Sequence, residues 1–189
     1  MAKIITERTN TELWQKLVQH AGDHCHLTLD EELESYLVFM LMRHLGDMDL
    51  ADTVIAPRYL KGLLMQGHSG IQELQTVGDQ CLLFSGLFPK RSRRRLVKAS
   101  YYVDIGRSAY LQLADRLKLT YAQLYQNLST HFVEMMDILQ ALRFSARAEE
   151  LDSLLLIDYS RENDSQYARK LLQERYNHSL CHPSKDSTH

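Results

Sequence analysis

Three charged residues interrupt two otherwise apolar stretches of the chain, and their side chains could do chemistry if they were buried together. Asp79 lies in the stretch VGDQCLLFSGLFP, and Asp104 and Arg107 lie in YYVDIGRSAY. Small residues recur in both stretches at helical spacing, which favours close contact between two helices. We therefore predict that the three side chains are partly buried and hydrogen-bonded to one another, because a buried unpaired charge is costly. Such a cluster either fixes the register of the helices or forms a pocket for a ligand or substrate.

A group of histidines near the N-terminus has the best spacing for a metal ion. His20 and His24 are four residues apart, as ligands on one helix often are, and His26 follows in the sequence QHAGDHCHL. Gly22, however, indicates that the helix ends there, which would destroy that geometry. We interpret the three histidines as weak metal candidates at a polar helix end, and the sequence predicts no metal and no cofactor.

A second polar group, His131, Glu134 and Asp137, follows the spacing of successive helical turns. Di-iron carboxylate bundles carry a Glu-x-x-His pair on each of two helices, whereas this chain has the reverse order and one copy. We interpret the group as an exposed polar flank. Phosphate-binding glycine loops, serine nucleophile elbows and kinase signatures are also missing from the sequence, so we predict no catalytic residue.

One short segment, here called the basic segment, concentrates positive charge. Six of the 22 basic residues lie within nine positions that hold no acid, and they are Lys90, Arg91, Arg93, Arg94, Arg95 and Lys98. All 24 acidic residues lie elsewhere. The basic segment is either a solvated turn between two helices or a binding surface for a protein, a nucleic acid or a lipid headgroup. No helix-turn-helix, zinc-finger or RNA-recognition pattern accompanies the arginines.

Helical periodicity dominates the chain, and strand-like alternation is nearly missing. The sequence therefore predicts an all-α fold, a single bundle of six to eight helices. The helix from Glu32 to Leu45 is apolar nearly all round and should lie in the middle of the bundle. The longest helix should run from Tyr121 to about Arg147 with an apolar seam at spacings of four and three residues. The other expected helices span about 10–21, 57–65, 69–88, 96–117, 151–159 and 164–176.

Two glycines mark where helices should approach each other closely. Gly78 and Gly86 share one face of the helix that contains Asp79, because they are eight residues apart. Each glycine inside a helix costs about 1 kcal/mol relative to alanine, and close packing would offset that cost. We predict that this face packs tightly against the helix that contains Asp104.

The chain should form one domain over residues 1–176 and a disordered polar tail over residues 177–189, since no linker divides it. The seam from Tyr121 to Ala146 is long enough to serve a second chain. We therefore predict a homodimer, unless the protein's own core absorbs the seam entirely.

The composition bounds the compartment. The longest apolar run, Tyr36–Met42, is far shorter than the roughly 20 residues that span a bilayer, and no signal-peptide stretch follows the N-terminus. Three widely spaced cysteines, Cys25, Cys81 and Cys181, fit reduced thiols. We expect a cytoplasmic protein without a transmembrane segment.

The phrases VGDQCLLFSGLFP and YYVDIGRSAY, separated by the arginines, resemble a pattern of small helical proteins of proteobacteria whose function is not established. The similarity covers about residues 74–113. It implies a bacterial, cytosolic protein and carries no activity or site residue to this chain.

The function that the sequence favours is therefore a non-enzymatic regulatory or adaptor protein, which binds a macromolecular partner through the basic segment. The alternatives are a small-ligand binder or enzyme that uses Asp79, Asp104 and Arg107, and a nucleic-acid-binding protein. The two classes differ in whether these three side chains line an open pocket or are sealed by the tyrosines around them.

Overall fold

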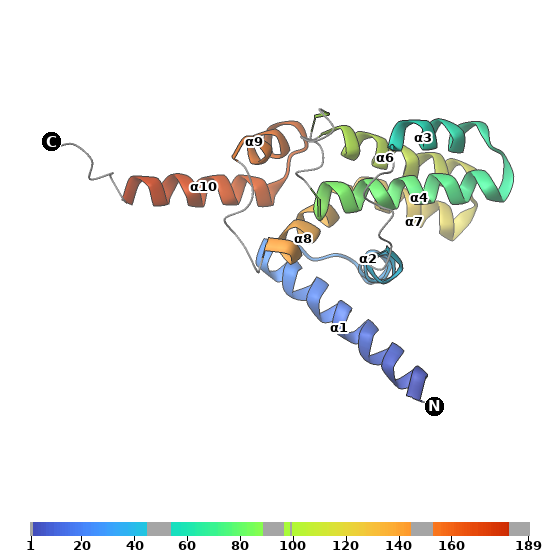
Figure 1. Ribbon diagram of the computed structural model, residues 1–189, viewed down its shortest axis with the longest axis horizontal. Helices are drawn as coiled ribbons and strands as arrows, with labels where there is room; N and C mark the ends of the chain where they lie inside the picture. The colour runs from blue at the N-terminus through green and yellow to red at the C-terminus, as the bar shows by residue number, and fades with distance from the viewer. Residues whose placement is uncertain (1, 45–53, 89–96, 99, 145–152, 182–189) are drawn as a thin grey trace.

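The computed structural model describes residues 2–44, 54–88, 97–98, 100–144 and 153–181, and those residues form nine helices and no strand (Figure 1). The helices are α1 (Ala2–Cys25), α2 (Glu31–His44), α3 (Ile55–Leu64), α4 (Gly67–Gly86), α6 (Ser100–Arg116), α7 (Leu119–Thr130), α8 (Phe132–Phe144), α9 (Ser153–Glu162) and α10 (Gln166–Cys181). The predicted all-α class is confirmed, although the helices outnumber the six to eight expected. None of these helices is long and apolar enough to cross a membrane.

Helix α4 is the centre of the fold. Its residues 77–87 are buried without interruption, and it packs against α3, α6 and α8. The prediction that the Glu32–Leu45 helix lies in the middle is wrong, because α2 packs mainly against α1 and α7 and leaves Phe39 56% exposed. Hydrophobic residues all round a segment indicate burial, but they do not say which of two such segments has more neighbours.

Glycines let α4 accept close neighbours on two sides. A Cβ added at Gly78 would overlap the ring of Tyr110 on α6, which confirms the predicted close approach of these two helices. A Cβ at Gly86 would instead overlap Leu139 on α8. The glycine face therefore serves two partners, and the ring of Tyr110 lies where a side chain of α4 would otherwise be.

Two helical hairpins turn at the same end of the molecule. Helices α3 and α4 form one hairpin, and α6 and α7 form the other. Arg116, at the end of α6, donates hydrogen bonds to the backbone carbonyls of Gly62 (2.9 Å), Leu63 (2.8 Å) and Met65 (3.1 Å) at the end of α3. The guanidinium thus satisfies carbonyls that have no partner within their own helix, and it ties the two corners together.

The predicted long helix is broken in the structure. Helix α7 ends at Thr130, α8 begins at Phe132, and His131 between them has φ −93° and ψ 18°. The seam also faces inward, since Leu128, Phe132 and neighbouring apolar residues are fully buried in the chain's own core. Among the described residues the seam is therefore not available to a second chain, while Ala146 and Arg147 lie outside the described residues.

The ends of the chain also differ from expectation. Helix α1 runs through Gly22 to Cys25, and α10 continues through the first residues of the predicted tail to Cys181. Both helices extend away from the body, α1 towards the lower right and α10 towards the left in Figure 1. The prediction of disorder is wrong for residues 177–181, and residues 182–189 lie outside the described residues.

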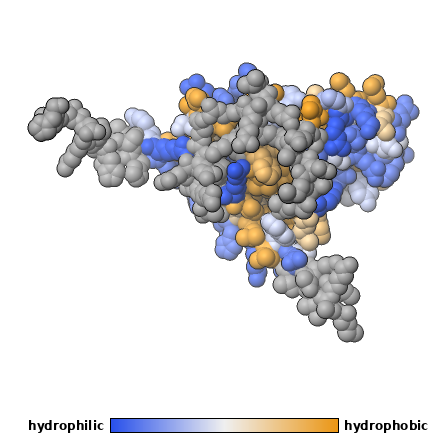
Figure 2. Space-filling view, viewed as in Figure 1, coloured by the Kyte–Doolittle hydropathy of each residue, from blue (hydrophilic) through white to orange (hydrophobic). Residues whose placement is uncertain are grey.

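Buried side chains from all nine described helices belong to one hydrophobic core. Large apolar side chains also reach the surface, and Figure 2 shows them as separate orange areas among hydrophilic ones. Scattered exposure of this kind is ordinary, so that only a group with further distinguishing features needs an explanation.

Candidate functional site

The carboxylate of Asp79 lies in the middle of α4 and is fully buried. Its Oδ1 atom accepts two hydrogen bonds, one from the hydroxyl of Tyr36 on α2 (2.6 Å) and one from the hydroxyl of Tyr110 on α6 (2.9 Å). One carboxylate oxygen therefore joins three helices. Hydrogen bonds to a charged acceptor are stronger than neutral ones, which offsets part of the cost of burial.

The second oxygen of the same carboxylate faces two basic side chains at the end of α2. Arg43 Nη1 and His44 Nε2 each lie 3.5 Å from Asp79 Oδ2. Neither Oδ2 nor His44 Nε2 has a hydrogen-bond partner among the described residues, although both atoms are buried. The arginine compensates the negative charge from the solvent side, since its side chain is 48% exposed.

Three tyrosine rings close the site. Tyr36 makes edge-to-face contacts with Tyr110 and Tyr125, with ring centroids 6.2 Å apart in each pair. Burial, and then the charge of Asp79, raise the pKa of Tyr36 and Tyr110 well above the ordinary value, and the same causes raise the pKa of Tyr125 to about 12. The hydroxyls therefore stay protonated at neutral pH and can donate to Asp79.

The predicted cluster of Asp79, Asp104 and Arg107 is wrong in two of its three members. Asp104 and Arg107 are exposed, and Arg107 Nε donates to the backbone carbonyl of Ser129 on α7 at 3.2 Å. The buried residues of α6 include Tyr102, Gly106 and Tyr110, which follow helical spacing, and both charged residues lie off that face. The burial of Asp79 was predictable from its apolar neighbours, but its partners on α2 were not.

A second buried carboxylate, Asp137 on α8, contradicts its interpretation as part of an exposed flank. Oδ1 accepts the hydroxyl of Ser165 at 2.6 Å, and Oδ2 accepts the backbone N–H of Tyr167 at 3.2 Å. Burial raises the pKa of Asp137 to about 6, although the hydrogen bonds from Ser165 and the backbone act in the opposite direction. Because these donors lie at the start of α10, Asp137 holds the N-terminus of that helix against α8.

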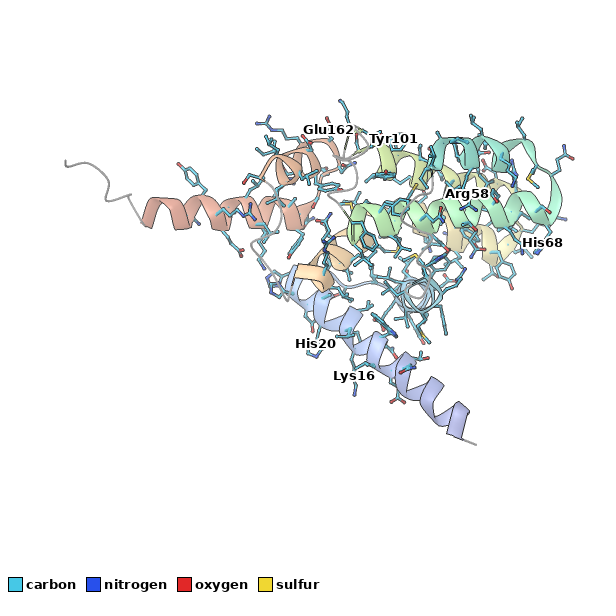
Figure 3. All side chains as sticks on the ribbon, in the orientation of Figure 1. Lys16, His20, Arg58, His68, Tyr101 and Glu162 are labelled. Carbon is cyan, nitrogen blue, oxygen red and sulfur yellow. The ribbon has the colours of Figure 1, made fainter. Side chains whose placement is uncertain are left out.

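The weak metal candidates do not form a site in the described part of the chain, which holds no group of three or more potential ligands. His20 points away from the body on α1, beside Lys16 (Figure 3). Lys170 Nζ donates to the carbonyl of His24 at 3.1 Å and lies 3.5 Å from His26 Nε2. A lysine ammonium at that distance disfavours a cation on His26.

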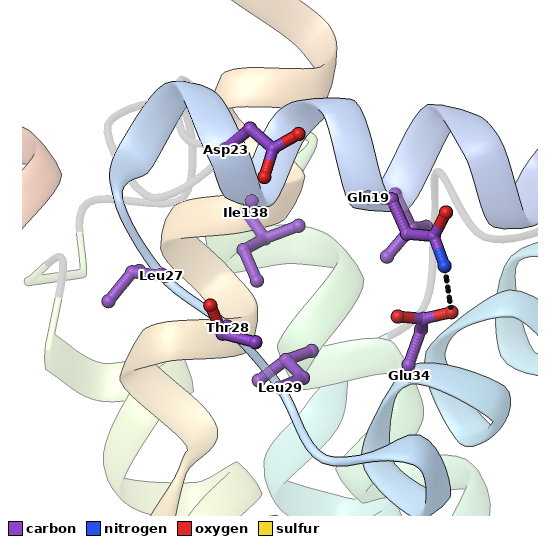
Figure 4. Close-up of a pocket in the computed structure, with 9 residues that line it drawn as sticks. Gln19, Asp23, Leu27, Thr28, Leu29, Glu34 and Ile138 are labelled. Atoms are coloured by element: carbon purple, nitrogen blue, oxygen red, sulfur yellow. Dashed lines mark hydrogen bonds between the residues drawn. The ribbon is translucent and has the colours of Figure 1, made fainter.

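A shallow pocket of about 70 Å³ lies between α1, α8 and the segment that leads into α2 (Figure 4). Glu34 on its rim accepts hydrogen bonds from Gln15 and Gln19, each at 2.9 Å. The lining includes Asp23, Leu27 and other side chains of mixed polarity. Pockets for drug-sized ligands are usually about 300 Å³ or larger, so this one is small for such a ligand.

The basic segment is described only at its end. Lys90, Arg91, Arg93, Arg94 and Arg95 lie outside the described residues. Lys98 is exposed, and its Nζ lies 3.3 Å from Glu162 Oε1 at the end of α9.

Comparisons of the chain with protein-family models, with curated proteins and with solved structures find no match. The structure therefore carries the functional argument by its own geometry.

Proposed function

We propose that the chain is a non-enzymatic regulatory or adaptor protein that binds a macromolecular partner through the basic segment. The observation that carries the proposal is the state of Asp79. This side chain is the residue around which an active site would form, but it is fully buried and two tyrosine hydroxyls occupy one of its oxygens. An internal tie between helices explains that arrangement without any substrate.

The surroundings of the basic segment support a binding surface. The segment connects α4 to α6, and the described residues on both sides reach the surface, namely Phe88 (46% exposed) and Lys98. Arg143 on α8 adds a further cation here, because its guanidinium lies 5.9 Å from the centre of the Phe88 ring. An acidic protein surface is the partner we favour, and a nucleic acid is the alternative. The bacterial cytosol and a homodimer are parts of the same proposal.

Salt dependence tests whether the basic segment contacts a polyanion. If Arg91, Arg93, Arg94 and Arg95 each neutralise a phosphate, affinity should fall steeply with salt, because each contact releases counterions. Four contacts imply a log–log slope of roughly −3 to −4 with duplex DNA, or about −3 with a single strand. Replacing the four arginines with alanine should flatten the slope and leave the thermal midpoint nearly unchanged, as binding titrations and thermal melts would measure.

The matched control removes exposed cations elsewhere, as in a Lys16→Ala/Arg169→Ala variant, which should keep the slope. A large loss of stability in the four-arginine variant would contradict the proposal, since the arginines would then pair with the acidic body. If the wild-type chain binds no DNA, RNA or heparin at low salt, nucleic acid is excluded and a specific acidic protein remains as the partner.

A second candidate function rests on the unpartnered atoms beside Asp79. Asp79 Oδ2 and His44 Nε2 are both buried without a hydrogen-bond partner among the described residues, and Arg43 connects them to the surface. A small anionic ligand or substrate could use such a group. A screen of small molecules in which the purified chain shows turnover, and loses it in an Asp79→Asn variant, would replace the adaptor proposal with this one.

A further inference from the structure

The two hairpin corners present the most exposed large hydrophobic side chains of the described chain. Leu64 at the end of α3 is 84% exposed, and Leu119 at the start of α7 is 89% exposed. Tyr121 and Leu60 are also more than half exposed. The hydrogen bonds of Arg116 to α3 show that both corners lie at one end of the molecule. We call Leu60, Lys61, Leu64, Lys118, Leu119 and Tyr121 together the leucine tip.

The leucine tip is basic as well as apolar. Lys61 and Lys118 are exposed, and His68 lies at the same end of the molecule (Figure 3). The stretches 60–68 and 114–121 contain one acidic residue, Asp115, against two lysines and one arginine. Lys61 also lies 3.9 Å from Glu73, which is held more closely by Arg58 at 2.7 Å. A cationic rim around protruding leucines is complementary to an anionic surface with an apolar interior.

Two helices begin at the leucine tip without side-chain caps. Neither Gln66, which precedes α4, nor Lys118, which precedes α7, uses its side chain to cap its helix. The first backbone N–H groups of a helix have no partner within the helix and attract anions. At the opposite type of terminus, Arg116 already neutralises the carbonyls of α3. The helix ends therefore add to the positive potential of the lysines.

The backbone at Leu119 makes the exposed leucine harder to explain as chance. Its φ of 52° lies in the left-handed region, which glycine or asparagine adopts at lower cost than leucine. A leucine at this position combines a strained backbone with an almost fully exposed apolar side chain. Both costs are recovered if the side chain is buried against another surface.

We propose that the leucine tip binds an anionic lipid surface. Leu64 and Leu119 enter the boundary between headgroups and acyl chains, Lys61 and Lys118 contact anionic headgroups, and Tyr121 lies at the interface. The convex shape of the tip supports a lipid occupant, because side chains that protrude from two corners fit a deformable surface. Helix α4 separates the tip from the basic segment by about 30 Å, given 20 residues at 1.5 Å each. The two surfaces are therefore distinct.

Vesicle binding tests the proposal on the full chain. Wild-type protein should co-sediment with vesicles of phosphatidylserine and phosphatidylcholine, and more weakly with phosphatidylcholine alone. A Leu64→Ser/Leu119→Asn variant should bind at least about tenfold more weakly, because most of the inserted apolar surface is gone. Asparagine at 119 tolerates the positive φ, so the variant should keep its fold. The matched control is Leu13→Ser/Leu17→Asn, which removes two exposed leucines of α1 and should bind as wild type does.

Tryptophan fluorescence tests insertion without any loss of binding. Trp14 is the only tryptophan, so a Trp14→Phe background accepts one reporter at a chosen position. A Leu119→Trp reporter should shift to the blue with anionic vesicles and be quenched by brominated acyl chains, whereas Leu13→Trp should show neither effect. Absence of wild-type binding, or equal binding by the tip and control variants, would overturn the proposal. The second result would assign lipid binding to the basic segment, and the first would leave a protein partner for the tip.

Discussion

Asp79 and Asp137 are both buried carboxylates, but their surroundings balance the charge by different means. Asp79 has tyrosine hydroxyls on one oxygen and the cationic side chain of Arg43 near the other. Asp137 has only neutral donors, a serine hydroxyl and backbone N–H groups. Neutral donors compensate burial less completely than an opposite charge, which agrees with the raised pKa of Asp137.

Removing the carboxylate of Asp79 should be strongly destabilising. An Asp79→Ala variant leaves the hydroxyls of Tyr36 and Tyr110 buried without an acceptor, and Arg43 without its counter-charge. We expect a loss of about 3 to 5 kcal/mol in the free energy of unfolding, measured by urea denaturation. Asp79→Asn should lose less, because the amide oxygen still accepts hydrogen bonds. The exposed Asp104→Asn change serves as the control and should stay within about 0.5 kcal/mol of wild type.

Asp137 should make the stability of the fold depend on pH. The folded chain holds the proton more tightly than the unfolded chain, because the pKa rises from 3.8 to about 6. The contribution of this group to stability is therefore full below pH 3.8 and is lost as the pH rises through about 6. The loss is on the order of 3 kcal/mol. Urea titrations from pH 4 to pH 7 would measure it.

The Asp137→Asn variant isolates that effect from all other titrations. Its free energy of unfolding should lack the part of the decline between pH 4 and pH 7 that belongs to Asp137, while Asp104→Asn should keep the wild-type profile. Identical profiles for wild type and Asp137→Asn would mean that the side chain does not hold its proton more tightly in the folded state.

The residues show what sequence patterns can and cannot reveal. The apolar neighbours of Asp79 predicted its burial correctly, whereas apolar neighbours also suggested burial of Asp104, which is exposed. Composition near a residue does not fix which way a side chain points, but the helical spacing of Gly106 and Tyr110 does. The partner Tyr36 is 43 residues away from Asp79 in the chain, and no local signal connects them.

At the level of elements, close packing of α4 on α6 depends on a missing side chain. A Gly78→Ala variant places a methyl group in the ring of Tyr110, whose hydroxyl is fixed by Asp79 and so cannot move freely. We expect a loss of about 1 to 3 kcal/mol, despite the better helix propensity of alanine. Thermal unfolding would measure it. A Gln72→Ala change at an exposed position of α4 is the control, and stabilisation by Gly78→Ala would contradict the packing.

The break between α7 and α8 illustrates why boundaries were harder to predict than helices. No glycine or proline marks the break, and the apolar spacing from Leu128 to Phe132 continues across it. His131 N–H still donates to the carbonyl of Asn127 at 2.9 Å, and Met135 N–H donates to His131 at 3.0 Å. Only the backbone angles of one residue change, so the hydrophobic pattern carries no trace of the break.

For the whole molecule, the sequence predicted the all-α class because helical periodicity recurs along the chain. It did not predict that α4 would be central, since this depends on how many helices pack against it. The leucine tip was also missed. Leu64 and Leu119 are 55 positions apart in the sequence, and they share an end of the molecule because two hairpins turn there.

The contacts of α4 and α1 have a consequence for the order in which the chain can fold during synthesis. Gly86 packs on Leu139, and the thiol of Cys25 donates to the backbone carbonyl of Asp137, 112 residues later. A nascent chain that ends before α8 therefore lacks the surfaces that cover α1 and one side of α4. These helices must stay exposed, or be shielded by other molecules, until about three quarters of the polypeptide has left the ribosome.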